Sequence, residues 1–208
     1  MGLFRRPGPR ERRLLALLDR RRRTAVGKRP ELDCRSFPLL FRRRAIVFTD
    51  MADFTVRTAR DGILHFLMIF ERAVAAVDPA VRRSGGELVK VEADSLLLRY
   101  DDATSACRGV AAVEAALTRL NKGRPENEQL RFSYGVGFGD VLDLDGDMFG
   151  LEVNLASKLG EDMAKPGEAL LTPSAAATLD RATLRKVVPY RVVTFGHSSM
   201  PVSRLKLR

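Results

Sequence analysis

Residues 45–55 read AIVFTDMADFT, a short apolar run that stops at an aspartate. A run of this length and composition predicts a buried strand over residues 45–49, with Asp50 at its end. Apolar residues then recur at the 3–4-residue spacing of one helix face until Asp78 and Pro79, where the helix is expected to end: Ile63, Phe66, Leu67, Phe70, Val74 and Val77. The segment therefore predicts a buried strand that leads into an amphipathic helix.

Downstream of this unit, strands and helices continue to alternate. ELVKV and SLLLRY flank Ala93 and Asp94 and predict a hairpin, with Asp94 near its turn. We expect a helix over residues 103–120, a strand over 131–138, a helix over 152–164 and a strand over 168–172. The order β-α-β-β-α-β with a strand-helix-strand extension predicts a ferredoxin-like α+β sandwich whose antiparallel sheet has helices on one face.

Positive charge is concentrated at the start of the chain. Residues 1–44 hold 15 of the 36 basic and 4 of the 26 acidic residues, a net charge of +11, whereas the remainder carries −1. This pattern predicts a basic helical N-terminal extension over residues 1–44 and one catalytic domain over residues 45–208. Because the body is nearly neutral, nucleic acid is not the expected partner.

The basic extension contains a predicted amphipathic helix, ERRLLALL, followed by Asp19 and four arginines, and it breaks near Gly27 and Pro30. Its leucines could cover the body or a partner subunit. An anionic membrane surface or an acidic protein partner remains the alternative, because leucines beside clustered arginines suit such surfaces. Gly2 gives only a weak myristoylation signal, since Arg6 stands where that motif has Ser or Thr.

The remaining composition points to a cytoplasmic protein. No apolar run approaches the ~20 residues of a membrane helix, and the start lacks a secretory signal; a peripheral membrane location through the extension stays open. Cys34 and Cys107 predict neither disulfide nor zinc site, and His65 and His197 lie too far apart to form a soft-metal cluster.

Two carboxylates have a placement that suits metal ions. Asp50 ends a buried strand, and Asp94 lies at a hairpin turn beside it in the predicted sheet. Together they could hold two divalent cations, Mg²⁺ or Mn²⁺, which prefer oxygen ligands and serve in-line displacement at phosphorus. Alternatively, each aspartate only caps a turn.

Four segments, in order through residues 45–172, resemble the class III adenylate and guanylate cyclases: VFTDMADFT, KVEAD, YGVGFGDV and FGLEVNLASKL. The resemblance implies that Asp50 and Asp94 ligate the two metal ions and that the Met51 carbonyl assists. It also implies that the backbone of Phe54 and Thr55 cradles phosphates.

In this alignment Lys90 and Asp147 occupy the two base-selecting positions. A lysine only donates hydrogen bonds and can meet the ring acceptor of adenine, while a carboxylate accepts from the exocyclic amino group. Guanine presents the opposite pattern, so the pair implies ATP in preference to GTP. As an alternative, Lys90 faces solvent.

Asn154 matches the asparagine that orients the ribose, and Lys158 stands one turn later where active members usually carry arginine. Lysine keeps the charge but loses the planar fork, which implies slower turnover. Two more departures occur: Ala93 and Asp53 replace family glycines, and Ala93 strains the turn if a positive φ is required.

Asp143, Asp145 and Asp147 resemble the start of a calcium loop, but Met148 and Asn154 stand where that loop needs glycine and glutamate. We therefore expect Asp143 and Asp145 to be solvated turn residues.

The resemblance implies conversion of ATP to cyclic AMP and pyrophosphate at the interface of a homodimer, in signal transduction. One chain is expected to supply Asp50, Asp94 and Lys90, and the other Asp147, Asn154 and Lys158. Two alternatives stay open. The first is a degenerate, weak or inactive cyclase-like dimer that binds nucleotide or acts as a signalling scaffold; the second is a cyclase for GTP or a pyrimidine nucleotide.

Overall fold

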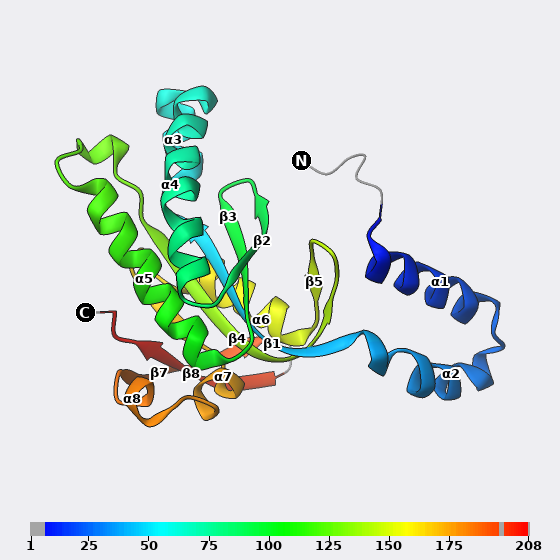
Figure 1. The fold of residues 1–208 in the computed structure, drawn as a ribbon. Helices are drawn as coiled ribbons and strands as arrows, with labels where there is room; N and C mark the ends of the chain where they lie inside the picture. The colour runs from blue at the N-terminus through cyan, green and yellow to red at the C-terminus, as the bar shows by residue number, and fades with distance from the viewer. Residues whose placement is uncertain (1–6, 196–197, 208) are drawn as a thin grey trace.

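The computed structural model describes residues 7–195 and 198–207, so Gly2, Arg6 and His197 lie outside the described residues (Figure 1). Its strands are β1 (Phe41–Met51), β2 (Glu87–Glu92), β3 (Ser95–Tyr100), β4 (Phe132–Asp143), β5 (Met148–Phe149), β6 (Ala169–Leu171), β7 (Val187–Phe195) and β8 (Ser198–Leu205). Its α-helices are α1 (Pro9–Arg23), α2 (Arg29–Ser36), α3 (Phe54–Asp61), α4 (Ile63–Arg83), α5 (Ala103–Asn121), α6 (Leu151–Lys158), α7 (Pro173–Ala177) and α8 (Arg181–Leu184).

One mixed sheet organises the body, with the strand order β2-β3-β1-β4-β6-β8-β7 and β5 paired to β4. Among the first four strands in this order, each strand runs antiparallel to its neighbour, and the order is that of a βαββαβ sandwich, as predicted. Only β6 runs parallel to its neighbour β4. The tail after residue 186 forms β7 and β8, and β8 pairs with β6, so the C-terminal segment completes the sheet.

The larger core lies between one face of the sheet and helices α4 and α5. Alternate residues of β1 face these helices, among them Ala45 and Val47, and both are fully buried. From β4, Phe132, Tyr134 and Val136 join the same core. The alternate apolar residues of the strands and the helically spaced apolar residues of α4 therefore pack together in one core, as the sequence indicates.

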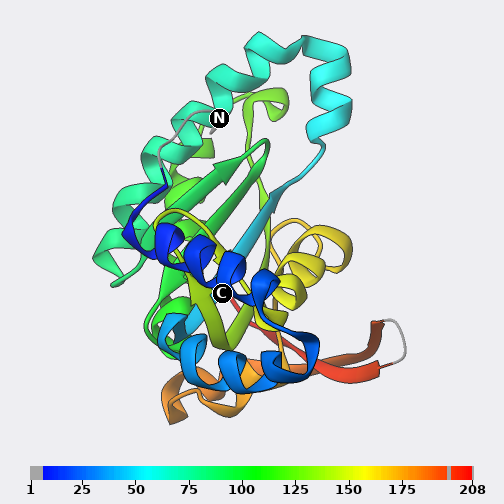
Figure 2. The same cartoon turned by 90° about the vertical axis from the view of Figure 1, so that its right-hand side faces the viewer.

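Helix α6 packs on the opposite face of the sheet, which corrects the prediction of helices on one face only. Figure 2 shows α6 (yellow) and the α4–α5 pair (teal and green) on opposite sides of the strands. Val153 and Ala156 of α6 form a second core with Ile46 of β1. Three glycines on β4 permit this contact, because a Cβ at Gly135 would lie 1.9 Å from the Ala156 carbonyl oxygen and one at Gly137 would lie 2.6 Å from that of Glu152.

Two helices differ in extent from the prediction. Helix α4 continues through Pro79 to Arg83 instead of ending near residue 78. Proline removes one helical hydrogen bond, but Ala80 and Val81 beyond it are buried in the main core, and their burial favours the continued helix. Helix α6 ends at Lys158 and is followed by a π-helical turn, Leu159–Met163, in place of continuous helix to residue 164.

The basic extension forms two helices, α1 and α2, where the sequence predicted one. Helix α1 ends at Arg23, near the expected break, and the Arg21 side chain pairs with Asp33 of α2 at 2.8 Å. None of the residues of α1 is buried, and Leu15 and Leu18 are 52% and 41% exposed. Strand β1 begins at Phe41, so α2 joins the sheet through a single turn, Pro38–Leu40. No helix in the described part of the chain has the length and apolar character needed to span a bilayer.

We predict that Gly135→Ala destabilises the domain. The added methyl group must displace the backbone of α6, and overpacking of this kind costs about 1–3 kcal/mol. The free energy of unfolding, measured by urea denaturation, should fall by about that amount. Gly27→Ala is the matched control because nothing lies within 4 Å of the position that its added methyl group would take; equal effects at the two sites would contradict the close packing of α6 on β4.

Candidate active site

The two predicted metal ligands lie near each other at one end of the sheet. Asp50 is the penultimate residue of β1, and Asp94 lies in the turn between β2 and β3, whose strand β3 pairs with β1. Both side chains are half-buried. The Ser133 hydroxyl of β4 donates to the Asp50 carbonyl oxygen at 3.3 Å and to that of Gly160 at 2.8 Å, which ties β1 to the turn after α6.

The electrostatics of this pair favour a bound cation. Burial, followed by the charges of Asp94, Glu161 and Asp162, raises the pKa of Asp50 to about 6. Burial also raises the pKa of Asp94, opposed by a backbone hydrogen bond. Neither carboxylate forms an ion pair within the described residues. Half-buried carboxylates that repel one another and have no cationic partner fit the ligand set of a divalent cation.

Among residues 7–195 and 198–207, no three His, Cys, Asp or Glu side chains gather closely enough to hold a metal ion by themselves. A site built on Asp50 and Asp94 thus needs further oxygen ligands from the main chain, from water or from the phosphates of a ligand. This arrangement is common for Mg²⁺, which binds through one or two carboxylates together with substrate phosphates.

Both positions at which this chain lacks the family glycine adopt left-handed backbone. Asp53 has φ = 64° and Ala93 has φ = 52°, and they are the only non-glycine residues with positive φ among those described. For L-residues other than glycine this conformation costs about 1–2 kcal/mol. The strain expected from sequence at Ala93 is therefore present, and Asp53 shares it.

Helix α3 begins directly after Asp53, at Phe54 and Thr55. The Phe54 ring packs edge-on against Phe66, with 4.5 Å between ring centroids, and this contact anchors the start of the helix to α4. The first N–H groups of a helix have no intrahelical acceptor and attract anions. The predicted phosphate contacts at Phe54 and Thr55 thus fall on a segment whose backbone can make them.

The two predicted base-selecting residues contact each other. Lys90 Nζ of β2 lies 3.0 Å from Asp147 Oδ2 in the loop between β4 and β5, and 2.7 Å from Glu92. Hydrogen bonds to Glu92 and Asp147 raise the pKa of Lys90 above its ordinary value, against an opposing effect of burial. This corrects the predicted division between subunits, because Lys90 and Asp147 form one unit within a single chain.

Asn154 and Lys158 lie one turn apart on the exposed face of α6. The Lys158 ammonium donates to Asp162 at 2.6 Å, and both side chains are more than half exposed. This hydrogen bond raises the pKa of Lys158. No hydrogen bond or ion pair joins Asn154 or Lys158 to Asp50 or Asp94 within the described part of the chain.

Glu152 is a residue whose role the sequence interpretation missed. Its carboxylate accepts from the Phe138 N–H at 3.1 Å and from the Thr172 hydroxyl at 2.8 Å. These bonds hold the first turn of α6 against β4 and against the residue that follows β6, and so set the direction of the face that carries Asn154. The sequence signal that could have indicated this role is the position of Glu152, two residues before Asn154, together with the alternating glycines of the preceding strand.

Asp143 is not a solvated turn residue, contrary to the prediction, whereas Asp145 is a half-buried residue of the turn between β4 and β5. The Asp143 side chain is fully buried and pairs with Arg44 at 3.1 Å, with Arg10 at 3.4 Å and with Arg99. The Asp145 carboxylate accepts from the backbone N–H of Arg10 at 2.8 Å. A buried carboxylate such as Asp143 requires partners of this kind, and here the partners come from distant segments of the chain.

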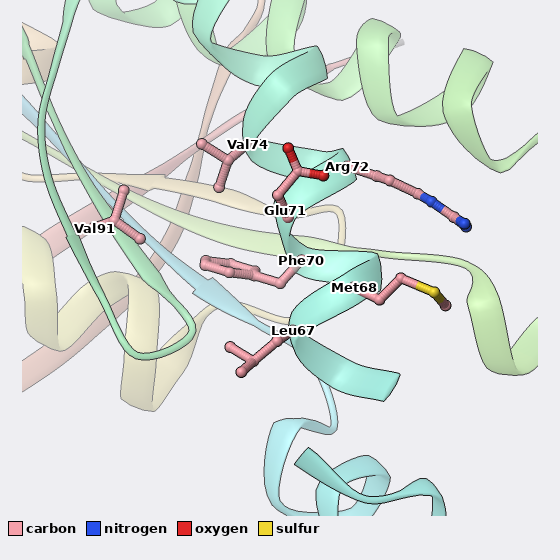
Figure 3. Close-up of a pocket in the computed structure, with 7 residues that line it drawn as sticks. All are labelled: Leu67, Met68, Phe70, Glu71, Arg72, Val74 and Val91. Carbon is pink, nitrogen blue, oxygen red and sulfur yellow. The ribbon is translucent and has the colours of Figure 1, made fainter. Parts of the chain in front are cut away.

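A surface hollow of about 600 Å³ lies between α4 and β2 and is mainly apolar. Figure 3 shows Leu67, Phe70 and Val74 of α4 on the side that faces Val91 of β2, while Met68 and Arg72 point away. None of the predicted site residues lines it. Among the described residues, its charged lining residues are Glu71 and Arg72 alone, and a single carboxylate without the predicted metal ligands does not make this hollow the candidate site.

Known proteins share both sequence and fold with this chain. A putative adenylate cyclase 3 of Rhizobium meliloti (strain 1021) is 30% identical over 128 residues, which is 61% of this chain and 22% of that protein. An adenylate cyclase of Streptomyces coelicolor is 34% identical over 139 residues, which is 65% of this chain and 34% of that protein. The adenylate/guanylate cyclase/hydrolase structure from Silicibacter pomeroyi superposes with a TM-score of 0.64 at 25% identity and covers 79% of this chain and 96% of that one.

The sequence and the fold of this chain are therefore both similar to those of adenylate/guanylate cyclase domains. No protein-family profile matches the chain. It spans about a fifth to a third of the length of the two curated relatives described above.

We predict that Ala93→Gly and Asp53→Gly each stabilise the protein, because glycine adopts positive φ without the Cβ clash. After the greater chain entropy of unfolded glycine is deducted, the free energy of unfolding should rise by about 0.5–1 kcal/mol at each position. Ala75→Gly, on the exposed side of α4, is the control and should lower it by about 1 kcal/mol. A loss of stability at residues 53 and 93 would contradict the strain.

A pH-dependent effect is expected for Asp50 in metal-free protein. Because its folded-state pKa, about 6, exceeds the ordinary 3.8, protonation stabilises the fold below about pH 4, and this contribution is lost as the pH rises through 6. Asp50→Asn should therefore raise the free energy of unfolding at pH 8 by about 1 kcal/mol, after allowance for solvent screening, and change it little at pH 4. Urea denaturation in EDTA measures this, with the exposed Asp140→Asn as control. Equal stability of wild type and Asp50→Asn at pH 8 would contradict the electrostatic account.

Proposed function

We propose that the chain converts ATP to cyclic AMP and pyrophosphate, with each site completed by a second copy of the chain. The observation that carries the proposal is the joint presence of the Asp50–Asp94 carboxylate pair and the Lys90–Asp147 ion pair. The first suits divalent cations on a triphosphate, and the second suits the hydrogen-bonding edge of adenine.

Asp50 and Asp94 are the residues that would hold two divalent cations, Mg²⁺ or Mn²⁺, together with the Met51 carbonyl. When bound, such ions supply charge neutralisation and activation of an attacking hydroxyl. In the reaction the ribose 3′ oxygen forms a bond to the α-phosphorus, the bond from this phosphorus to the pyrophosphate oxygen breaks, and the proton of the 3′ hydroxyl is released to solvent. The N–H groups at the start of α3, at Phe54 and Thr55, support the phosphates.

Adenine preference follows from the chemistry of the pair Lys90 and Asp147. At their 3.0 Å contact, the ammonium group offers only donors and the carboxylate offers only acceptors. Adenine, with a ring acceptor beside an amino donor, can bridge the two groups and satisfy both. Guanine presents a ring donor and a carbonyl acceptor on the same edge, so either group would be left mispaired, and such mispairing costs about 1–3 kcal/mol per group.

Asn154 and Lys158 would act on the ribose and on the developing phosphate charge. Their side chains project from the exposed face of α6 and make no bond to the carboxylate pair in the same chain. A second subunit that faces α6 would bring its Asp50 and Asp94 to these residues, which gives the proposed homodimer two equal sites. In this arrangement one chain supplies the metal ligands, and the other supplies Lys90, Asp147, Asn154 and Lys158.

A specific observation favours one rival, a weak or inactive cyclase-like dimer that signals by conformation. Lys158 already bonds to Asp162 at 2.6 Å, so it must leave this partner before it meets a phosphate. Lysine also lacks the planar fork with which arginine binds two oxygens. Both features predict slow turnover, and complete loss of turnover would favour the rival.

We also propose that residues 1–44 form an N-terminal extension of the catalytic domain of residues 45–208, joined to it through residues 41–44, which begin β1. The support is that α1 and α2 add few residues to the core of the body: only Leu32 and Leu40 are buried among the described residues of this range.

The proposal predicts that purified protein with Mn²⁺ or Mg²⁺ forms cyclic AMP from ATP and much less cyclic product from GTP, CTP or UTP. Asp50→Ala should reduce turnover by about 100-fold or more, because the divalent cations that bind the nucleotide phosphates lose a carboxylate ligand. Cyclic nucleotides are quantified by liquid chromatography and mass spectrometry.

Three outcomes separate the candidates. Cyclic AMP that disappears in Asp50→Ala supports the adenylate cyclase, and a main product from GTP or a pyrimidine nucleotide supports the other cyclase. If folded and dimeric protein forms no cyclic product from any nucleotide, the catalytic proposal is wrong. Lys158→Arg should raise kcat with little change in KM, and Lys122→Arg, at an exposed loop position, serves as the matched control.

A further inference from the structure

We propose that Arg10, in the N-terminal extension, is a positioning residue for Asp147 and thereby for base selection. Two features that lie far apart in the sequence meet here: the start of helix α1 and the loop of residues 143–147. Figures 1 and 2 both show the start of α1 (dark blue) beside this loop, which precedes β5. The part that concerns base selection rests on the proposed function.

The first contact is a helix cap supplied by the loop. Asp145 Oδ2 accepts from the backbone N–H of Arg10 at 2.8 Å and from that of Glu11 at 3.3 Å. No side chain within α1 caps these groups, since the N-cap residue is Gly8. A carboxylate at this position satisfies otherwise unpaired donors and interacts favourably with the helix dipole. Helix α1 and Asp145 therefore stabilise each other.

The second contact is the Arg10 side chain, which reaches Asp143 twice. Its guanidinium donates to the Asp143 carbonyl oxygen at 3.3 Å and pairs with the carboxylate at 3.4 Å. The buried Asp143 carboxylate also has Arg44 and Arg99 as partners. Loss of the Arg10 side chain leaves Asp143 paired with Arg44 and Arg99 and removes one of the two links between α1 and the loop. The other link, the Asp145 cap, uses backbone N–H groups and is retained, so a variant at this position should remain folded.

A third set of contacts leads from the loop to the base-selecting group. The Leu144 N–H donates to the Asp147 carbonyl oxygen at 3.0 Å, and Asp147 Oδ1 accepts from the Met148 N–H at 2.9 Å. The other carboxylate oxygen of Asp147 holds Lys90. Only two residue pairs join β4 to β5, so the strand ladder alone constrains this loop weakly. Arg10 and the Asp145 cap supply the additional constraint at its outer end.

It follows that docking of α1 holds Asp147 in the orientation that meets Lys90. Release of α1 frees the loop, and the Asp147 carboxylate then samples orientations in which it cannot accept from a base amino group. The extension thus acts on nucleotide recognition without touching the nucleotide.

The experiment is hydrogen–deuterium exchange on the full chain without nucleotide, which requires no catalytic activity. In Arg10→Ala, amide exchange in residues 144–148 should accelerate by about fivefold to tenfold, as expected for loss of a charged hydrogen bond. Arg13→Ala, an exposed arginine on the same helix, should leave this segment unchanged. Gly8→Ala is a second variant, because its methyl group would lie 2.2–2.4 Å from Asp145 side-chain atoms and should also accelerate exchange. Unchanged exchange in both Arg10→Ala and Gly8→Ala would overturn the proposal.

The consequence for recognition is measured separately in protein that turns over ATP. Arg10→Ala should raise the KM for ATP and reduce the preference for ATP over GTP by about fivefold to tenfold, with little change in kcat, and Arg10→Lys should restore part of the preference. A fall in kcat alone would contradict a positioning role. If wild-type protein is inactive, the proposed function fails while the exchange result still decides whether Arg10 orders the loop.

Discussion

Helix α6 lies so close to β4 that only residues without a β-carbon fit on the facing side of the strand, and much of the candidate site depends on this contact. Gly135, Gly137 and Gly139 alternate along one face of β4, so a β-carbon at any of them would overlap α6. Gly160, just past the helix, approaches the Phe48 carbonyl in the same way. The glycines bring the helix that carries Asn154 and Lys158 close to the strand pair that ends at Asp50.

The acidic residues of the candidate site fall into two groups that differ in their partners. Asp50 and Asp94, at one end of the sheet, are half-buried and have no cationic partner among the described residues. Asp143 at the end of β4, and Asp145 and Asp147 in the loop that follows, each have partners of their own. Asp143 neutralises arginines of three segments, Asp145 caps α1, and Asp147 holds Lys90. One group of acids therefore favours bound metal ions, and the other is satisfied by the protein itself. The difference lies in the partners within reach, because the residue type is the same.

Local sequence signals predicted the elements whose structure is determined locally. The apolar run before Asp50, the hairpin around Asp94 and the helix-breaking residues after Arg23 appear close to where the patterns put them. The face of α6 could not be predicted in this way, because alternating glycines in a strand predict only weak pairing until the helix that fills the space is known. The roles of Asp143 and Asp145 were missed for a related reason. Their partners Arg10 and Arg44 lie about a hundred or more residues away, and charge patterns do not identify such pairs. Backbone strain at Asp53 and Ala93 was foreseeable only through comparison with the glycines of the cyclase family.

In the proposed enzyme one chain holds two half-sites that act only across a dimer. Mixing two inactive variants tests this division directly: Asp50→Ala loses a metal ligand, and Asn154→Ala loses the ribose contact on the opposite half-site. Each variant alone should form almost no cyclic AMP. An equimolar mixture, allowed to exchange subunits, should recover about a quarter of wild-type activity, since half of the dimers are mixed and each mixed dimer has one intact site. No recovery from a mixture shown to contain mixed dimers would contradict the division, because both residues would then be required in the same chain.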